Sequence, residues 1–380
     1  MADKIRVGTV GATVTPGGSG WGANAHVPAL RALPEYELWA VCTAHEETAR
    51  ASADAFGAEL AFDNFETMLA EPEIDLVTVV VRVPGHHDLV MKALQAGKAV
   101  FCEWPLGASV AEAEHLARLA AERSLRTAVG LQARSDPTLM YARELVEQGH
   151  IGKVLLVNLT YTSPAVTRRG EGRIWQADRR NAANTLTIAA GHTIDGMCFV
   201  VGEFEEVSAR LATTITEWHN TDTGQSVTVD SPDWISVSGR LERGAQASCL
   251  VATVPSNPGG TRLEIYGSRG TLVITSGSLH AGPNHLQGAR GGEPLAPMEA
   301  PDRFRLVPEG FPGGPPRNVG QAYARIARAL ASGEPYYPDF AHALKRHQLI
   351  EAIEQSAANG GRSVRLAPEA ARASVPRGVG

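Results

Sequence analysis

A glycine-containing turn at the end of the first apolar segment is the earliest feature that could do chemistry. The segment Ile5–Val10 includes Gly8 and runs into Gly11, Ala12 and Thr13. A strand that leads through glycine into a helix lets the backbone approach a pyrophosphate, whose charge then faces the helix N–H groups. The complete G-x-G-x-x-G pattern is absent, because Thr13 stands where a further glycine would be expected. We expect a dinucleotide to bind here, and a plain βα loop is the alternative.

The loop after this turn and the end of the second strand bear on which dinucleotide would bind. Residues 16–22 form a glycine-rich loop that carries Trp21, a further candidate for cofactor contact, before a helix begins near Ala25. Sites that prefer NAD usually carry an acid at the end of strand two, which binds the ribose hydroxyls. This sequence has Thr43 and His45 there instead. Either residue would tolerate a 2′-phosphate, so the sequence favours NADP over NAD; side chains with no role are the alternative.

Alternating strand and helix patterns in the first third must position these residues. Short apolar runs rich in β-branched residues suit strands that are buried on both faces of a parallel sheet. These runs cover residues 5–10, 38–42, 75–81, 99–102 and 127–131. Helical patterns lie between them at residues 25–33, 46–56, 64–69, 86–96 and 109–122. The alternation predicts a right-handed, doubly wound α/β Rossmann domain over residues 1–130.

The pattern changes after residue 130, where strands follow one another. Helical periodicity covers residues 137–147, 185–201, 318–332 and 340–359. Strand-like patterns cover residues 153–163, 206–215, 225–229, 234–240, 245–254 and 262–274, the last with a turn at 267–270. Residues 282–320 are rich in glycine and proline and are predicted to form a long surface loop. We expect an α+β domain over residues 131–380, with a large open, mainly antiparallel sheet and helices on one face.

The composition is that of an ordinary soluble globular protein. The chain has 380 residues, of which 43% are hydrophobic and 20% charged, and its net charge is −6. This charge argues against direct nucleic-acid binding through phosphate contacts. The four cysteines are scattered without metal-binding spacing, so we expect buried free thiols, a reducing cytoplasm and no metal site. The sequence shows neither a secretion signal nor a membrane-spanning run.

An ordered set of short motifs gives the chain a resemblance to a known family. In chain order the motifs begin at Gly8, His26 (His-Val-Pro-Ala-Leu), Gly97 (Gly-Lys), Phe101 (Phe-Cys-Glu-Trp-Pro-Leu), Arg134 (Arg-Ser-Asp-Pro), Gly191 (Gly-His-Thr-Ile-Asp) and Pro338 (Pro-Asp-Phe). On this set the chain resembles the Gfo/Idh/MocA family over almost its whole length. The resemblance implies a Rossmann domain, a C-terminal α+β domain, and oxidation or reduction of sugars and cyclitols with NAD(H) or NADP(H).

Two positions depart from the usual pattern of that family. Trp104 stands in the Glu-Trp-Pro motif where the family carries a lysine near nicotinamide and substrate. Ile188 stands four residues before His192, where the family carries an aspartate. The Trp21 loop and the Glu-Trp pair resemble the branch of galactose-pathway regulators and their bacterial relatives. Trp104 could stack on a nicotinamide or a sugar ring, or it could only fill the space.

His192 is the residue that remains of the family's usual catalytic set. Oxidation of an alcohol needs a base within hydrogen-bond reach of the hydroxyl, with a pKa near the working pH. Asp195, one turn later on the same helix face, could set the orientation of His192. Tyr161 is the alternative proton donor. In the opposing interpretation, His192 hydrogen-bonds within the interdomain packing and Asp195 caps or pairs locally.

Further cofactor and substrate contacts follow from the same resemblance. The remaining cofactor candidates are Val83, His87, Glu103, Trp104 and Gln132. The substrate candidates are Trp104, Arg134, Trp175, Arg179, Asn184 and His192, whose polar groups could bind sugar hydroxyls or an acidic substituent. Arg134 could instead brace the domain junction, and the polar stretch after Trp175 could be a solvated loop.

Three functions are consistent with these features. The first is an NAD(P)-dependent oxidoreductase of a sugar-like compound, with His192 as acid/base. The second is a cofactor-sensing regulator that binds a partner protein without turnover. The third is a lyase or epimerase that oxidises its substrate transiently. We favour the first, because tryptophan at position 104 removes one proton route and leaves hydride transfer feasible. The family resemblance also implies a homo-oligomer, either a dimer or a tetramer.

Overall fold

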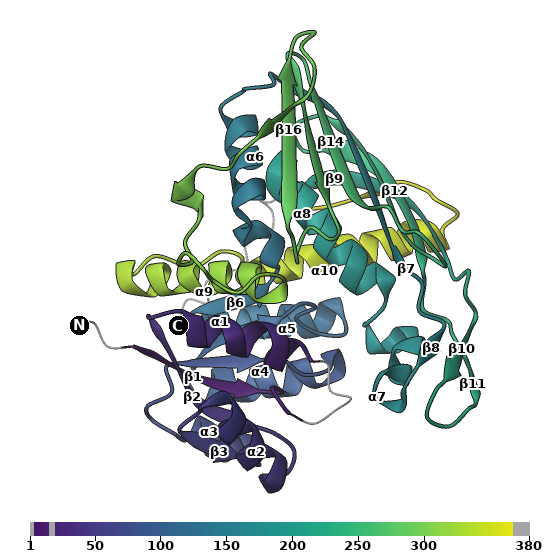
Figure 1. The fold of residues 1–380 in the computed structure, drawn as a ribbon. Coiled ribbons are helices and arrows are strands. Elements are labelled where there is room, and N and C mark those ends of the chain that lie inside the picture. Colours follow the sequence, from purple (N-terminus) through teal and green to yellow (C-terminus); the bar gives the residue numbers. More distant parts are fainter. Residues whose placement is uncertain (1–3, 15–19, 368–380) are drawn as a thin grey trace, which may run out of the picture.

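Two large sheets organise the chain, and helices cover and join them (Figure 1). The computed structural model describes residues 4–14 and 20–367. A six-stranded sheet forms the lower half of the view, and a nine-stranded sheet rises above it. A small three-stranded sheet lies beside them. The architecture is therefore the predicted one, a doubly wound domain followed by an α+β domain.

The N-terminal sheet is parallel throughout and has the strand order β3-β2-β1-β4-β5-β6. Its strands are β1 (Ile5–Val10), β2 (Tyr36–Cys42), β3 (Leu60–Phe62), β4 (Leu76–Val79), β5 (Ala99–Glu103) and β6 (Thr127–Gly130). Every residue of β4 is buried, as expected for a strand that is covered on both faces. The apolar runs predict five of these strands, and the short edge strand β3 was not predicted.

The helices of this domain follow the predicted periodicity. They are the π-helical turn η1 (Gly22–His26), α1 (Val27–Ala32), α2 (Glu46–Phe56), α3 (Phe65–Leu69), the turn η2 (Val83–Gly85), α4 (His86–Gln95) and α5 (Val110–Glu122). Side-chain caps start two of them: Asn64 accepts a hydrogen bond from the Thr67 amide, and Ser109 accepts one from the Glu112 amide. These caps fix where α3 and α5 begin.

The C-terminal sheet has the order β17-β16-β15-β14-β7-β13-β12-β9-β18. Its strands are β7 (Val154–Pro164), β9 (Phe204–Ala212), β12 (Trp234–Leu241), β13 (Gln246–Val254), β14 (Gly260–Gly267), β15 (Gly270–Ser276), β16 (Asn284–Arg290), β17 (Ala296–Met298) and β18 (Val364–Arg365). Strands β7 and β13 pair in parallel, and the other pairs are antiparallel. The prediction of a large, mainly antiparallel sheet is confirmed.

The segment 282–320 is not one long loop, and that prediction is wrong. Its first part joins the large sheet as β16 and β17, a short turn η7 (Asp302–Phe304) follows, and its end belongs to α9 (Pro315–Ser332). Gly288 lies inside β16, where a Cβ would come within 2.4 Å of Met298 Sδ. Pairing with β15 therefore overrides the low strand propensity of this segment.

The last helices connect the two domains. One face of the large sheet carries α6 (Pro137–Glu147), α8 (Gly191–Val201) and α10 (Phe340–Ala358) (Figure 1). Helix α10 packs on both β9 and α5, and α9 packs on α1 and η1. The predicted helix over residues 185–201 is divided, because its first part is the π-helical segment η6 (Thr185–Ala190) and α8 continues from it. The turn η3 (Gln132–Ser135) leads from β6 into α6.

The small sheet and its short helices close one side of the molecule. Its strands are β8 (Arg168–Arg169), β10 (Glu217–Asn220) and β11 (Ser226–Thr228), in the order β11-β10-β8. The turns α7 (Glu171–Ile174), η4 (Trp175–Ala177) and η5 (Arg179–Asn181) pack beside it. The sequence predicts only β11 of this unit, because two- and four-residue strands carry little periodicity.

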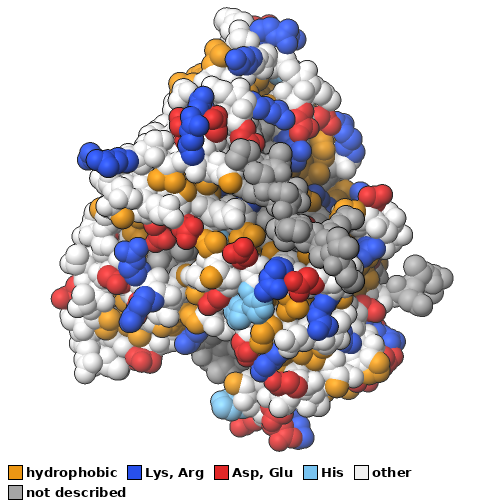
Figure 2. All heavy atoms as spheres, turned by 180° about the vertical axis from the view of Figure 1, so that it is seen from behind, with side chains coloured by type: hydrophobic (Ala, Val, Ile, Leu, Met, Phe, Trp, Pro, Cys, Tyr) orange, Lys and Arg blue, Asp and Glu red, His pale blue; other side chains and the backbone are white. Residues whose placement is uncertain are grey.

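The surface and the cysteines agree with the composition. Acidic and basic side chains are interspersed over the face shown in Figure 2. Within the described residues, no helix combines the length and the apolar character that a bilayer crossing requires. All four cysteines are buried free thiols, as predicted.

Candidate active site

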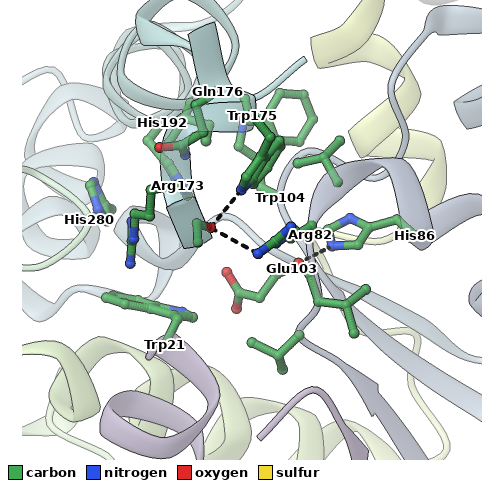
Figure 3. A pocket seen from close by; sticks show the side chains of 16 residues that line it. Trp21, Arg82, His86, Glu103, Trp104, Arg173, Trp175, Gln176, His192 and His280 are labelled. Atoms are coloured by element: carbon green, nitrogen blue, oxygen red, sulfur yellow. Dashed lines mark hydrogen bonds between the residues drawn. The ribbon is translucent and has the colours of Figure 1, made fainter. Parts of the chain in front are cut away.

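A cavity of about 260 Å³ lies where the carboxyl ends of β4 and β5 face α8 and the small sheet (Figure 3). Ligands bind at this edge in open α/β sheets. Six predicted site residues line the cavity: Trp21, Val83, Glu103, Trp104, Trp175 and His192. Three of them are tryptophans, so much of the wall is aromatic. Large aromatic surfaces of this kind suit a nicotinamide ring or the C–H face of a sugar.

Glycine is required where the first βα loop meets the end of β4. Gly11 has φ +97°, and a Cβ there would lie 2.4 Å from the Val80 carbonyl oxygen. A Cβ on Gly22 would lie 2.9 Å from the Cα of the buried Ala12. The backbone is thus drawn close to the strand ends, which fits a dinucleotide cradle. Residues 15–19 of the loop lie outside the described residues.

Other predicted cofactor residues occupy less direct positions. A Cβ on Gly8 would meet Ile74 at 2.9 Å, so Gly8 serves packing against the sheet. Thr13 is partly buried at the bend after β1. Beyond β2, the Thr43 hydroxyl lies 3.0 Å from the His45 carbonyl oxygen, and His45 is exposed. Neither Thr43 nor His45 lines the cavity.

Glu103 is held at the floor of the cavity by His26 and Gln132. Its Oε1 lies 2.8 Å from both His26 Nε2 and Gln132 Nε2, and its Oε2 lies 2.8 Å from Gln132 Nε2. The other ring nitrogen of His26, Nδ1, lies 2.9 Å from the Tyr323 hydroxyl. A Cβ on Gly130 would lie 2.5 Å from Glu103 Oε1. Gln132 therefore acts on the cavity through Glu103.

Trp104 forms one wall without closing the cavity. The indole is 4% exposed, and its Nε1 donates to the Thr187 carbonyl oxygen at 2.8 Å. Its ring lies against His347, with ring centroids 4.7 Å apart. A Cβ on Gly191, the first residue of α8, would come within 2.6 Å of Trp104 Nε1. The fit between α8 and this indole thus depends on glycine at position 191.

His192 is a buried imidazole with an uncommitted nitrogen. Within the described part of the chain, its Nδ1 has no hydrogen-bond partner. Burial, together with the neighbouring His280, holds the pKa of His192 well below its ordinary value. His280 stacks on it, and burial lowers the pKa of His280 to about 4. Both rings are therefore neutral near pH 7, when His192 can accept a proton.

Asp195 does not orient His192, contrary to our expectation. It is fully buried, and Arg134 donates to both its oxygens, from Nε at 2.8 Å and Nη2 at 2.9 Å. His342 Nε2 and Arg346 Nε also reach Asp195 Oδ1, at 2.9 Å and 3.1 Å. Glu203 completes this cluster through Arg346. The Asp195 carboxylate is occupied by Arg134, His342 and Arg346, which belong to other elements, so it pairs across the domain junction and not within its own helix.

Four other predicted residues lie away from the first cavity. Arg134 braces the domain junction through Asp195 and does not line the cavity. Tyr161 is 8% exposed within the core of the large sheet. Arg179 pairs at the surface with Glu354. Asn184 caps η6 by accepting from the amides of Leu186 and Thr187, and it lines a second cavity.

The predicted histidine at the end of β4 is displaced by one position. His87 points to α5, where its Nε2 lies 2.8 Å from His115 Nδ1. His86 lines the cavity instead, with its ring nitrogens 2.7 Å and 3.0 Å from the carbonyl oxygens of Pro105 and Val81. Helical rotation by one residue turns the side chain by about 100°, so neighbouring histidines cannot both face the cavity.

Several cavity residues were not predicted. Arg82 donates to the Gly172 carbonyl oxygen at 2.9 Å and lies over the Trp175 ring, which ties the small sheet to the end of β4. His280 and Arg173 line the opposite side (Figure 3). These residues come from segments far apart in the sequence, and no local sequence pattern predicts their position in the cavity. Within the described residues, no group of three or more His, Cys, Asp or Glu side chains could hold a metal ion.

A doubly wound domain whose strand ends open on an aromatic cavity defines a dinucleotide-binding class of protein. Residues 13–131 match the oxidoreductase family with an NAD-binding Rossmann fold, and residues 137–276 match the C-terminal domain of Gal80p. The chain is 32% identical over 299 residues to the dehydrogenase aclE of Aspergillus oryzae, covering 75% of this chain and 81% of that protein. The chain therefore belongs to the Gfo/Idh/MocA oxidoreductase family.

Two further similarities concern a regulatory protein and a solved dehydrogenase structure. The chain is 27% identical over 299 residues to the galactose/lactose metabolism regulatory protein GAL80 of Saccharomyces cerevisiae, covering 72% of this chain and 67% of that protein. A levoglucosan dehydrogenase solved with NADH and levoglucosan superimposes with a TM-score of 0.83 at 23% identity, covering 96% of this chain and 100% of that chain. The second similarity establishes the fold alone.

Proposed function

We propose that this protein is a nicotinamide-dependent dehydrogenase that acts on a hydroxyl or carbonyl group of a sugar, a cyclitol or a related compound. The observation that carries the proposal is the buried His192 in the wall of this cavity, whose Nδ1 has no hydrogen-bond partner among the described residues. The similarity to the dehydrogenase aclE supports the same class of reaction.

The turn after β1 and the adjoining cavity offer a binding position for the dinucleotide. Gly11 and Ala12 would face its pyrophosphate, and Trp21, Val83 and Glu103 would border its nicotinamide end. When bound, the cofactor supplies the hydride acceptor or donor. The absence of an acid at Thr43 and His45 favours NADP, whereas the levoglucosan dehydrogenase was solved with NADH. Dissociation constants for the two oxidised cofactors, measured side by side, decide between them.

His192 would take the hydroxyl proton in the oxidation direction. A neutral imidazole with an unpartnered nitrogen is an acceptor; burial and His280 lower the pKa of His192, which keeps the ring neutral and makes it a weaker base than an ordinary histidine. Trp104 cannot exchange a proton, so its contribution is to shape the wall and exclude water. Glu103 stays anchored by His26 and Gln132 and positions the ligand without leaving its place.

The test is a substrate screen that follows nicotinamide absorbance. Purified protein is first titrated with NAD⁺ and NADP⁺ to establish binding. It is then offered sugars, cyclitols and the corresponding ketones, with oxidised or reduced cofactor. We expect a substrate-dependent change in nicotinamide absorbance. Tight cofactor binding without turnover on any compound would count against a dehydrogenase.

A cofactor-sensing regulator is the second candidate. It is favoured by the match of residues 137–276 to the Gal80p C-terminal domain and by tryptophan at position 104. Such a protein would capture a protein partner in a manner that depends on NAD(P). A pull-down with and without cofactor tests this, and turnover by the purified chain excludes regulation as the sole role. We also propose that the protein is a cytoplasmic homo-oligomer. Sedimentation of the purified chain tests its oligomeric state.

A further inference from the structure

A second cavity of about 310 Å³ adjoins the first. It lies between the small sheet, the start of η6 and the ends of large-sheet strands. Four residues line both cavities: Arg173, Gln176, Ala183 and Ile188. A ligand held beside His192 could therefore extend past these residues into the second space.

Arg169 gives the second cavity a positive charge. Its guanidinium lies over the Trp218 ring at 4.4 Å, and its Nη1 donates to Gln176 Oε1 at 2.6 Å. Its buried Nε has no partner among the described residues, and no carboxylate there forms an ion pair with it. Burial and the nearby Arg173 lower the pKa of Arg169 to about 10, so the group remains charged near pH 7.

The one acid that lines this cavity does not neutralise Arg169. Asp233 Oδ1 accepts from the Thr214 amide at 2.7 Å and hydroxyl at 2.9 Å, and Oδ2 accepts from the Ile215 amide at 2.7 Å. Both oxygens are thus engaged by the loop that follows β9. A partly buried guanidinium without a carboxylate partner is costly unless a ligand supplies the anion.

We propose that the second cavity binds a negatively charged group of the substrate, a carboxylate or a phosphate, while the reacting hydroxyl lies beside His192. The inference rests on the proposed dehydrogenase function and narrows its substrate to acidic sugars. A guanidinium recognises both anions through its N–H donors, and Arg169 lines the second cavity. Gln176, which holds Arg169, lines both cavities and fixes the direction of the guanidinium.

The experiment compares acidic with neutral sugars in the presence of oxidised cofactor. Binding of D-glucuronate, D-galacturonate and glucose 6-phosphate is measured by calorimetry against D-glucose and D-galactose. We expect at least one acid to bind tenfold or more tightly than its neutral counterpart, with an affinity that falls as salt is added. The carboxylate and phosphate probes distinguish the two anions.

Arg169→Gln removes the charge, and Arg179→Gln is the matched control on the same unit, outside both cavities. Arg169→Gln should abolish the preference for the acid and leave neutral sugars unchanged, whereas Arg179→Gln should behave as wild type. If Arg169→Gln fails to fold, Arg169→Lys keeps the charge without the fork and should lose part of the preference. Equal binding of acids and neutral sugars, or equal effects of the two glutamine variants, overturns the inference.

These measurements distinguish a failure of the anion-site proposal from a failure of the dehydrogenase proposal. Acid binding that depends on Arg169 without any turnover supports the anion site and contradicts the dehydrogenase. Turnover of acidic and neutral sugars at similar rates, with neither rate changed by Arg169→Gln, supports the dehydrogenase and contradicts the anion site.

Discussion

His280 stacks on His192, with imidazole centroids 4.2 Å apart and planes inclined by 18°. Burial and this neighbour together keep His192 neutral, because a proton on either ring would repel one on the other. The loop that carries His280 is therefore part of the candidate active site, although it belongs to the C-terminal sheet. The relationship leads to the first prediction.

Replacing His280 should move the pH dependence of activity. In His280→Gln the neighbouring imidazole is gone, so the pKa of His192 should rise toward its ordinary value. The acidic limb of kcat/KM should then shift to higher pH, which initial rates over pH 4 to 8 would reveal. A limb that stays in place, or moves to lower pH, would show that His280 does not tune His192.

Gly191 and Trp104 should be energetically coupled. Gly191→Ala forces its Cβ into the indole and should lower the free energy of unfolding by about 1–3 kcal/mol. Trp104→Phe removes the colliding atoms, so the double variant should lose less than the sum of the single losses. Chemical denaturation of all four proteins gives the coupling, and strict additivity contradicts the collision.

Asp195 should matter for stability more than for proton transfer. Asp195→Ala leaves the buried Arg134 and Arg346 without their shared carboxylate and should cost about 3–5 kcal/mol. Asp195→Asn keeps the shape and part of the hydrogen bonding and serves as the milder comparison. A stable Asp195→Ala protein that has lost only activity would restore the catalytic role we first assigned to this residue.

Buried neutral histidines should make folding sensitive to mild acid. Burial lowers the pKa of His347 to about 3 and that of His342 to about 4. Below pH 6.5 these histidines bind protons in the unfolded chain but stay neutral in the folded chain. The free energy of unfolding therefore decreases as the pH is lowered, by about 1.4 kcal/mol per pH unit for each such group. This loss begins below about pH 6.5 and continues down to the folded pKa values.

His347→Phe should make that loss shallower, because one of these groups no longer titrates. Unfolding free energies measured between pH 6.5 and 5 test this before carboxylates begin to protonate. An unchanged slope would mean that His347 is protonated or solvated in the folded protein.

The sequence predicted the fold where a signal was local and strong. Continuous apolar runs located β1 and β4, and helical periodicity located α3 and α5. The edge strand β3 is too short for periodicity, and β16 depends on pairing with a distant partner. Such pairing is a property of the folded chain.

The candidate site was predictable in part for the same reason. Trp104 and His192 stand in short motifs, so the family resemblance located them. His280 and Arg169 belong to no motif, and their meaning comes from contacts with His192 and with Gln176. The expectation that Asp195 orients His192 was wrong, because helical spacing shows which residues share a face of the helix but does not show which residues they contact. The actual partners, Arg134 and Arg346, come from other elements.

The central claim is that His192 moves the substrate proton in a cofactor-dependent oxidation. The most direct measurement is the initial rate of nicotinamide reduction by wild type and His192→Ala, at equal occupancy by the oxidised cofactor. We expect unchanged cofactor affinity and a rate at least about 100-fold lower in the variant. A variant that binds cofactor normally and turns over at the wild-type rate would contradict it.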